Sequence, residues 1–413
     1  EDISYRVNVA NIKMAVCTPD SDTVENILQA KNKENSLKTV FVARKDFDGT
    51  VNITKEIESA GAELERVETK ATEPMLIYFT SGTTGYPKAV VHNHIYSLCH
   101  IISAKYWQNV KEGGLHFSIA ETGWAKASYG KIYGQWLCGC GVMVYDFDIF
   151  SPDKLLKVIE DFKVTSFCAP PTVYRYFIKK DMKKFDLSHL EHITTAGEAL
   201  NPEVFEQVHK QTGLQIMEGF GQTESVLMLG NLVGSKAKIG SLGKPTPLYN
   251  IMIADNEGNR LPANEVGEIV VIPSENQHGI FMGYCGNEDL YANVWKYGIY
   301  HTGDTAYMDD DGYYWYVGRI DDLIKTRGYR VGPFEIENVL MEHPAVMECA
   351  VTGVPDKARG QAIKATIHLA KGFDKSKELM QDIKHFVNSK VASYKHIQHI
   401  EFIDEMPKTI SGK

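Results

Sequence analysis

The stretch NPEVFEQVHKQTGLQIMEGFG, residues 201–221, contains the patterns of a helix and of a strand in direct succession. Asn201 is a typical N-cap, Pro202 suits the first position of a helix, and Gly213 is typical of the residue that ends one. The apolar run around Ile216 then predicts a buried strand. A helix that leads into a buried strand indicates an α/β layer with a largely parallel sheet.

The same alternation extends upstream of this stretch. Residues 152–162, PDKLLKVIEDF, predict a helix, and residues 164–170, VTSFCAP, predict a buried strand. Polar residues follow the predicted strands at TTAGEAL (194–200) and EGFGQTES (218–225). Since ligands of such sheets bind at the carboxyl ends of the strands, these two segments are candidate binding sites.

Two further regions have patterns of their own. Residues 240–318 alternate short strands with turns, which predicts an antiparallel or distorted barrel-like unit. From residue 322 onward helices near 332–343 and 375–390 alternate with strands, as in a compact α+β domain of about 90 residues. We therefore expect a large domain over 1–318, a hinge at 319–321 and a small C-terminal domain over 322–413.

Composition restricts the classes of function. The 413 residues carry a net charge of −9, which argues against general binding to nucleic acid or anionic membranes. Apolar runs are only strand-sized and the first residues are polar, so no membrane span and no signal peptide are expected. The seven scattered cysteines are interpreted as reduced, buried thiols, which predicts a cytoplasmic location. The abrupt ends suggest a piece of a longer protein.

The motif YFTSGTTGYPK, residues 78–88, is typical of a phosphate-binding loop. Small residues let backbone N–H groups approach an anion, and hydroxyl groups can donate to phosphate oxygens. The glycine spacing fits neither a Walker P-loop nor a dinucleotide fingerprint. Taken alone, the motif leaves a polar turn without function as the alternative.

Five more segments follow the loop in order. They are TTAGEAL, EGFGQTES, YHTGD (300–304), GRIDDLIKTRGYRVGPFEIE (318–337) and PKTISGK (407–413). With them, residues 75–413 resemble the adenylate-forming (AMP-binding) superfamily, and within it most the medium-chain acyl-CoA synthetases. Residues 1–70 fit loosely, and an N-terminal part of the large domain and a short C-terminal tail are expected to be missing.

The resemblance implies a fold and a reaction. The fold is an α/β large domain with mixed, largely parallel sheets and a distorted β-barrel part, followed by a small mobile α+β domain. In the reaction a carboxylic acid attacks the α-phosphate of ATP, which gives acyl-AMP and pyrophosphate, and the thiol of CoA then displaces AMP. The implied cofactors and partners are ATP, Mg²⁺, CoA and a small-molecule acid, a short- or medium-chain or branched fatty acid, with the protein a monomer or homodimer.

The resemblance also implies roles for residues that bind the nucleotide. The loop that holds the β- and γ-phosphates consists of Thr80, Ser81, Gly82, Thr83, Thr84, Gly85 and Lys88. The residues around the adenine are Gly197, Glu198 and Ala199 on one side and Glu218, Gly219, Phe220, Gly221 and Gln222 on the other. Thr223 reaches the α-phosphate, and Glu224 holds Mg²⁺, a cation suited to carboxylate and phosphate oxygens.

Other implied roles concern the ribose and the movement between half-reactions. Asp304 accepts hydrogen bonds from both ribose hydroxyls, and Arg319 lies near the ribose, with a turn residue or a surface pair as the alternative for each. Arg330 approaches phosphate or CoA, with a plain surface arginine as the alternative. Asp321 matches the hinge residue, with a linker carboxylate as the alternative, and Lys413 matches the catalytic lysine, with a solvated lysine as the alternative.

The acyl pocket is assigned to Trp124, Phe220 and Gly221, with a core aromatic as the alternative for Trp124. Relatives restricted to acetate have tryptophan where this chain has Gly221, so the resemblance implies a pocket larger than acetate.

Three competing functions remain at this stage. They are an adenylation domain that loads a carrier protein, a luciferase-type oxygenase, and a nucleotide-binding relative that has lost catalysis. The presence of Lys413, Glu224 and Asp304 argues against the last.

Overall fold

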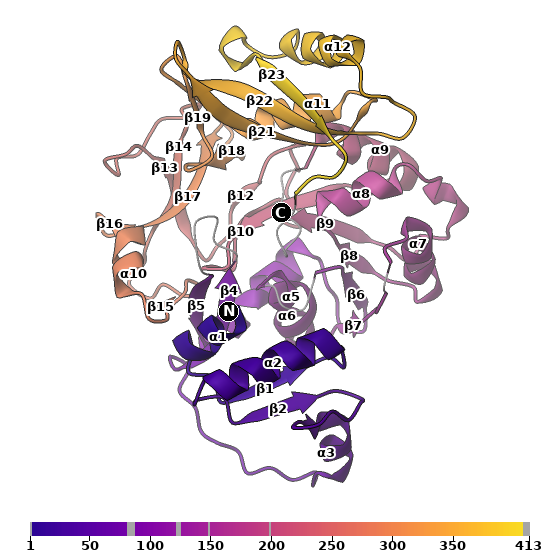
Figure 1. The fold of residues 1–413 in the computed structure, drawn as a ribbon, viewed down its shortest axis with the longest axis vertical. Coiled ribbons are helices and arrows are strands. Elements are labelled where there is room, and N and C mark those ends of the chain that lie inside the picture. The colour runs from indigo at the N-terminus through magenta and orange to yellow at the C-terminus, as the bar shows by residue number, and fades with distance from the viewer. Residues whose placement is uncertain (1, 81–86, 121–124, 148, 198–199, 408–413) are drawn as a thin grey trace. The chain divides into compact units, whose positions relative to one another are not determined.

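The computed structural model describes most of the chain, in five ranges (Figure 1): 2–80, 87–120, 125–147, 149–197 and 200–407. Within these ranges no helix combines the length and the apolar character needed to cross a bilayer. All seven cysteines are free thiols.

Contacts divide the chain into two units. The first comprises residues 1–96 and 280–293, and the second comprises residues 97–279 and 294–413. This division differs from the predicted domains, and the boundary at 319–321 stays a prediction.

The first unit contains two three-stranded sheets. The parallel sheet has the order β1-β2-β3, and the antiparallel sheet has the order β15-β5-β4. Its core is formed by Val7, Ile27, Leu37 and Val40. The elements are α1 (Asp2–Val9), β1 (Met14–Cys17), α2 (Ser21–Lys33), β2 (Thr39–Val42), β3 (Val51–Asn52), α3 (Ile53–Ser59), β4 (Pro74–Thr80), β5 (Lys88–Asn93), α4 (His94–Ile101, which continues into the second unit), β15 (Gly283–Tyr284) and α10 (Glu288–Val294).

A seven-stranded sheet forms the centre of the second unit, with the order β12-β11-β10-β9-β8-β6-β7. The strands from β7 to β10 are parallel, and β11 and β12 are antiparallel to their neighbours. The strands are β6 (Leu115–Ser118), β7 (Gly141–Met143), β8 (Ser166–Cys168), β9 (His192–Ala196), β10 (Ile216–Gly221), β11 (Leu227–Gly230) and β12 (Lys244–Pro245). The accompanying helices are η1 (Ile102–Trp107), α5 (Ala125–Ala127), η2 (Ser128–Ile132), α6 (Tyr133–Leu137), α7 (Pro152–Asp161), α8 (Pro171–Phe177), η3 (Met182–Lys184) and α9 (Pro202–Thr212). The predicted largely parallel sheet is therefore present.

Helix α9 forms for the reasons that its sequence indicates. The Asn201 side chain accepts a hydrogen bond from the Glu203 N–H at 2.8 Å, and Gly213 ends the helix with a φ of 76°. The apolar side chains Val204, Phe205 and Val208 are buried in one core with residues of α7, β8, β9 and β10. This packing holds β10 in the sheet. The segment EGFGQTES begins within β10 and continues past its carboxyl end.

The antiparallel part of the second unit is an open five-stranded sheet. Its order is β13-β14-β17-β16, and β18 pairs with β17. The strands are β13 (Asn250–Ala254), β14 (Gly267–Ile272), β16 (Trp295–Lys296), β17 (Ile299–Met308) and β18 (Tyr314–Arg319). The barrel-like element of the prediction thus consists of strands that do not close into a barrel among the described residues.

The C-terminal part has its own sheet and core, as the α+β prediction requires. The sheet order is β20-β19-β22-β21, with β23 parallel to β22. Buried Ile336, Leu340, Ile363, Ile383 and Val387 join helices and sheet. The elements are β19 (Ile324–Thr326), β20 (Tyr329–Val331), α11 (Pro333–Met341), β21 (Val346–Asp356), β22 (Gly360–Leu369), α12 (Lys377–Asn388), η4 (Ser393–Lys395) and β23 (His399–Ile403).

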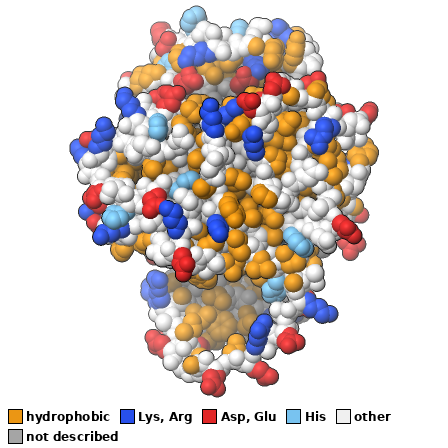
Figure 2. Space-filling view, turned by 180° about the vertical axis from the view of Figure 1, so that it is seen from behind, with side chains coloured by type: hydrophobic (Ala, Val, Ile, Leu, Met, Phe, Trp, Pro, Cys, Tyr) orange, Lys and Arg blue, Asp and Glu red, His pale blue; other side chains and the backbone are white. Residues whose placement is uncertain are grey.

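The surface combines both signs of charge with apolar areas. Figure 2 shows hydrophobic side chains gathered on one face, with acidic and basic side chains dispersed around them. In the stretches of chain before and after β7, the side chains of Trp136, Val144 and Ile149 are exposed.

Candidate active site

The hydroxyl-rich loop connects two antiparallel strands of the first unit. Thr80 ends β4 and pairs in register with Lys88, which begins β5. The Lys88 ammonium lies 5.7 Å from the centre of the Tyr284 ring. This hairpin differs from the strand and helix that flank a Walker loop, which agrees with the sequence argument against that motif.

In the second unit, the end of β10 continues into a closed turn. The Gln222 N–H donates to Ser225 Oγ at 3.1 Å, and the Ser225 N–H donates to the Gln222 carbonyl at 3.2 Å. Thr223 and Glu224 occupy this turn and are half-buried. A hydroxyl and a carboxylate therefore follow directly after the glycine-rich strand end.

Asp304 is the centre of a hydrogen-bond network. Its carboxyl accepts bonds from Arg319 Nη1 at 3.1 Å, from the Tyr316 hydroxyl at 3.1 Å and from Gln222 Nε2. Gln222 is itself oriented, because its Oε1 accepts from the Tyr300 hydroxyl at 2.9 Å. The structure thus brings together three predicted site residues, Gln222, Asp304 and Arg319.

The electrostatics of Asp304 follow from its burial. The residue is only 4% exposed, and this burial raises the pKa of its carboxyl. Arg319, Tyr316 and Gln222 lower that pKa, because each donates to the charged form. For Tyr316, burial and then the negative charge of Asp304 raise the pKa of the hydroxyl. Tyr316 therefore remains a neutral donor, and the three donors together favour the ionised carboxylate.

Glu218 is a second buried carboxyl group, on β10. It is 2% exposed, and its Oε1 accepts from the Leu200 N–H at 3.1 Å. Its Oε2 has no hydrogen-bond partner among the described residues. Desolvation raises the pKa of Glu218 to about 8, although the hydrogen bond from the Leu200 N–H lowers this pKa in part. Glu218 thus connects β10 to the end of the predicted adenine-binding segment.

The sequence analysis missed two residues, Tyr316 and Lys126. Each forms a hydrogen bond within a predicted binding segment. Tyr316 bonds to Asp304, and Lys126 donates from Nζ to the Ala196 carbonyl at 2.5 Å, beside Gly197. A bulge in the β17–β18 pairing, between Thr305 and Ala306, places Tyr316 and Arg319 near the same carboxylate. Sequence spacing gives no signal for this bulge, because a regular strand directs residues three apart to opposite faces.

Close packing explains the two glycines of β10. A Cβ atom on Gly219 would lie 2.7 Å from the Trp107 ring, and one on Gly221 would lie 2.9 Å from the Val226 carbonyl oxygen. In the Cβ direction, the space beside Gly221 is therefore occupied by backbone. Phe220 lies beside Tyr316, with 6.5 Å between the ring centres.

Replacing Gly221 by alanine is expected to destabilise the protein. The added methyl group must displace the Val226 carbonyl, and overpacking of this kind costs about 1–3 kcal/mol of unfolding free energy. Urea denaturation of Gly221→Ala measures it, and Gly61→Ala is the control because a Cβ there meets nothing within 4 Å. Equal stability of the two variants would contradict this account. Gly221→Trp, which introduces the tryptophan of the acetate-restricted relatives, is expected to lose unfolding free energy for the same reason.

Other predicted residues lie apart from this network or outside the described part. Asp321 is exposed after β18, and Arg330 is exposed on β20, opposite Lys325. The predicted site residues outside the described residues are Ser81, Gly82, Thr83, Thr84, Gly85, Trp124, Glu198, Ala199 and Lys413.

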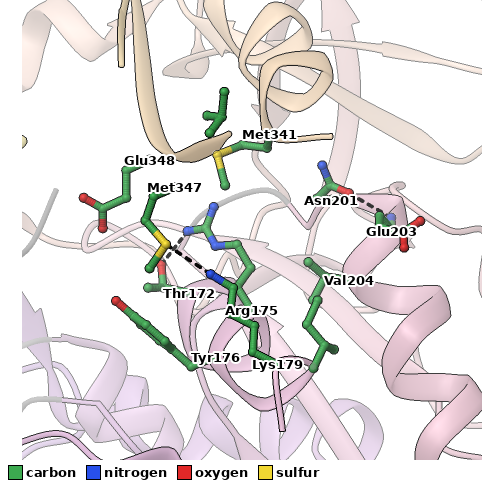
Figure 3. Close-up of a pocket in the computed structure, with 12 residues that line it drawn as sticks. Thr172, Arg175, Tyr176, Lys179, Asn201, Glu203, Val204, Met341, Met347 and Glu348 are labelled. Atoms are coloured by element: carbon green, nitrogen blue, oxygen red, sulfur yellow. Dashed lines mark hydrogen bonds between the residues drawn. The ribbon is translucent and has the colours of Figure 1, made fainter. Parts of the chain in front are cut away.

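A separate cleft of about 120 Å³ lies between α8, α9 and the C-terminal elements α11 and β21 (Figure 3). Lys179 Nζ lies 3.1 Å from the Met347 sulfur, and Arg175 donates to Thr172 Oγ1 at 2.7 Å. Burial, followed by the charge of Arg175, lowers the pKa of Lys179. None of the residues assigned to nucleotide or acid lines this cleft, so it is distinct from the Asp304 network.

Comparison with known families identifies two matching models. The AMP-binding enzyme family matches residues 1–285, and the AMP-binding enzyme C-terminal domain matches residues 335–413. These matches confirm the predicted resemblance to the adenylate-forming superfamily.

Curated relatives match over nearly the whole chain. The acyl-coenzyme A synthetase ACSM4 of Mus musculus, named as mitochondrial, is 40% identical over 100% of this chain and 72% of the relative. The 4-hydroxybutyrate–CoA ligase 1 of Metallosphaera sedula is 40% identical over 95% of this chain and 70% of the relative.

Solved structures share the fold. The anthranilate CoA ligase AuaEII, in complex with anthranoyl-AMP, has a TM-score of 0.91 at 29% identity over 100% of this chain and 78% of its own. A benzoate CoA ligase from Burkholderia xenovorans has a TM-score of 0.86 at 25% identity over 100% of this chain and 80% of its own. The predicted fold class is confirmed. The chain therefore belongs to the AMP-binding enzyme family, and it is similar over its length to the acyl-coenzyme A synthetases of that family.

Proposed function

We propose that the chain is an AMP-forming acid–CoA ligase that activates a carboxylic acid as acyl-AMP and transfers the acyl group to CoA. The observation that carries this proposal is the buried Asp304 carboxylate with its three donors, Arg319, Tyr316 and Gln222. A carboxylate that is held in one orientation can accept from two adjacent ribose hydroxyls. The family and the relatives supply the reaction in which such a nucleotide takes part.

In the first step the protein acts by positioning charged reactants. The backbone and hydroxyls between Thr80 and Lys88 bind the β- and γ-phosphates, and Thr223 binds the α-phosphate. Gly197 to Ala199 and Glu218 to Gln222 enclose the adenine. The acid's carboxylate then attacks phosphorus, pyrophosphate leaves, and Lys413 stabilises the charge that shifts between them.

The residues present fit a magnesium ion. Glu224 places a carboxylate in the turn that begins at Gln222, next to the Thr223 hydroxyl, and Mg²⁺ prefers one or two carboxylates together with phosphate oxygens. Among the described residues no cluster of three or more His, Cys, Asp or Glu side chains offers an all-protein metal site. When bound, Mg²⁺ would neutralise phosphate charge, and Glu224 is the residue that we propose to hold it.

In the second step the thiol of CoA displaces AMP. We propose that a hinge at 319–321 lets the domain over 322–413 reorient relative to the domain over 1–318 between the steps, with Asp321 absorbing the backbone change. Arg330 is exposed on β20, and we propose that it meets a phosphate of the nucleotide or of CoA.

The acid is proposed to be a short- or medium-chain or branched fatty acid, bound next to Trp124, Phe220 and Gly221. A cytoplasmic location stays a prediction, since the mouse relative is named as mitochondrial.

The chain is expected to catalyse acid-dependent exchange between pyrophosphate and ATP. The assay uses the full chain with Mg²⁺, and it tests aliphatic acids of increasing length and aryl acids. Labelled pyrophosphate is added, and the label that appears in ATP measures the exchange. Replacing Glu224 by glutamine should raise the Mg²⁺ concentration needed for half-maximal exchange, because a neutral amide binds Mg²⁺ less well than a carboxylate.

Two outcomes would count against the proposal. Absence of exchange with every acid contradicts the ligase function. Exchange without faster AMP release on adding CoA contradicts CoA as the acceptor and favours a carrier-protein thiol. Glu257→Gln, a change at an exposed carboxylate in the turn after β13, is the matched control and should leave the Mg²⁺ requirement unchanged.

A further inference from the structure

The carboxylate of Glu268, on β14, holds the turn that presents Asp304. Its Oε1 accepts from the Gly303 N–H at 2.8 Å, and its Oε2 lies 2.7 Å from His301 Nδ1. Because these partners are the residues before and after Thr302, the Glu268 side chain contacts both ends of the segment 301–303. The Glu268 side chain is only 14% exposed, which limits competition from water.

This segment needs such a partner because the sheet pairing is interrupted there. Glu268 pairs with Thr305, but Val270 pairs with His301, so β17 contains extra residues opposite β14. Residues inside a bulge lose ladder partners for their backbone N–H groups, and a buried N–H without an acceptor is costly. Glu268 provides that acceptor at Gly303.

The geometry of Gly303 determines where Asp304 lies. Gly303 has a φ of +72°, in the left-handed region, and a Cβ atom there would lie 2.9 Å from Arg319 Nη2. The turn therefore brings the backbone close to the same guanidinium that binds Asp304. A shift of the Gly303 peptide would move the Asp304 carboxylate relative to Arg319 and Tyr316.

We propose that Glu268 is a positioning residue for nucleotide binding: it fixes the 301–303 turn so that Asp304 meets both ribose hydroxyls. This inference rests on the proposed function, in which Asp304 binds the ribose. Glu268 acts through the Gly303 peptide and does not itself touch the nucleotide. His301 orients the second oxygen of Glu268 and thereby the carboxylate plane.

The test combines a change in the protein with a change in the nucleotide. Glu268→Ala should raise the KM for ATP about tenfold, the effect of one lost hydrogen bond to a charged group, and leave the KM for the acid unchanged. With 2′,3′-dideoxyATP the variant and the wild type should differ by less than about twofold, because a displaced Asp304 then has no hydroxyl to lose. Glu265→Ala, at an exposed carboxylate before β14, is the matched control.

Two conservative variants keep the test decisive if Glu268→Ala does not fold. Glu268→Gln retains an oxygen acceptor for Gly303 and should keep most of the affinity for ATP. Glu268→Asp shortens the side chain and should show a smaller loss that again disappears with the dideoxy nucleotide. A loss of equal size with ATP and 2′,3′-dideoxyATP, in whichever variant folds, would overturn the inference.

Failure of the inference and failure of the proposed function are distinguishable. If the wild type shows no acid-dependent pyrophosphate exchange, the ligase function itself is wrong. If the wild type exchanges but does not discriminate ATP from 2′,3′-dideoxyATP, the ribose role of Asp304 is wrong, and the positioning role of Glu268 is overturned with it.

Discussion

Replacing Glu218 by glutamine is expected to change the free energy of unfolding more favourably at pH 8 than at pH 5, when the variant is compared with the wild type at the same pH. The Glu218 carboxyl is buried in β10, and desolvation raises its pKa from 4.5 to about 8. In the unfolded chain it ionises near its ordinary pKa, whereas in the folded chain it stays protonated up to about pH 8. Between these two values the folded state holds one more proton than the unfolded state.

The sign of the effect follows from this proton. Where the folded state binds more protons, the free energy of unfolding falls as the pH rises, by about 1.4 kcal/mol per pH unit for one proton. From pH 5 to pH 8 the wild type therefore loses roughly 4 kcal/mol through this one group. Glutamine does not titrate, so the difference between variant and wild type should grow by that amount over the same range.

Urea denaturation at pH 5, 6, 7 and 8 measures this difference, in which all other titrating groups cancel. Glu206→Gln, at an exposed carboxylate of α9, is the matched control. The unsatisfied amide N–H groups of the glutamine destabilise the folded state by an amount that does not depend on pH. The test is therefore how the stability difference between variant and wild type changes with pH. A stability difference that stays constant with pH would show that Glu218 is already ionised in the folded state.

Replacing Lys413 by alanine is expected to slow adenylation about a hundredfold and to leave thioester formation intact. Lys413 lies in PKTISGK, which matches the catalytic lysine of the family, and it lies outside the described residues. During the first step charge shifts among the carboxylate, the α-phosphate and pyrophosphate. Loss of one preorganised donor at such a site typically costs about 3 kcal/mol of transition-state stabilisation.

The measurement separates the two half-reactions. Acyl-AMP formation is followed from ATP and acid, and thioester formation is followed from supplied acyl-AMP and CoA. Lys371→Ala, at an exposed lysine between β22 and α12, is the control and should leave both rates unchanged. Adenylation at the wild-type rate in Lys413→Ala would remove this residue from the mechanism, and equal loss of both steps would point to a general defect.

Local sequence signals were sufficient for the parallel sheet and its helices. Asn201, Pro202 and Gly213 bound α9 as predicted, since caps depend on residues adjacent in the chain. Asp304 and Arg319 were also singled out from the sequence, because each lies in a motif of the family, and their roles toward the nucleotide stay predictions. Their pairing on β17 and β18 was not predicted, because it depends on the register shift between Thr305 and Ala306.

Features that depend on tertiary structure were not predicted. The contribution of Tyr316 requires a bulge, and the role of Glu268 requires a second interruption between β14 and β17. The close approach of the Val226 carbonyl to Gly221 was also not predicted, because the sequence pattern does not specify how the chain turns back between β10 and β11. These features arise where strands meet irregularly, and no periodicity in the chain encodes them.

The position of Arg319 has a thermodynamic consequence. Arg319 is the partner of Asp304 and also the last residue of β18, and the next residue, Ile320, donates from its N–H to the Gly303 carbonyl at 2.9 Å. The turn that we propose to bind the ribose is thus hydrogen-bonded to the first residues of the proposed hinge. If a nucleotide favours one hinge conformation by a given factor, that conformation must favour the nucleotide by the same factor, because linkage is reciprocal. A substitution in the hinge that touches no ligand should therefore change nucleotide affinity, and the size of that change would measure how strongly the nucleotide itself drives the domain.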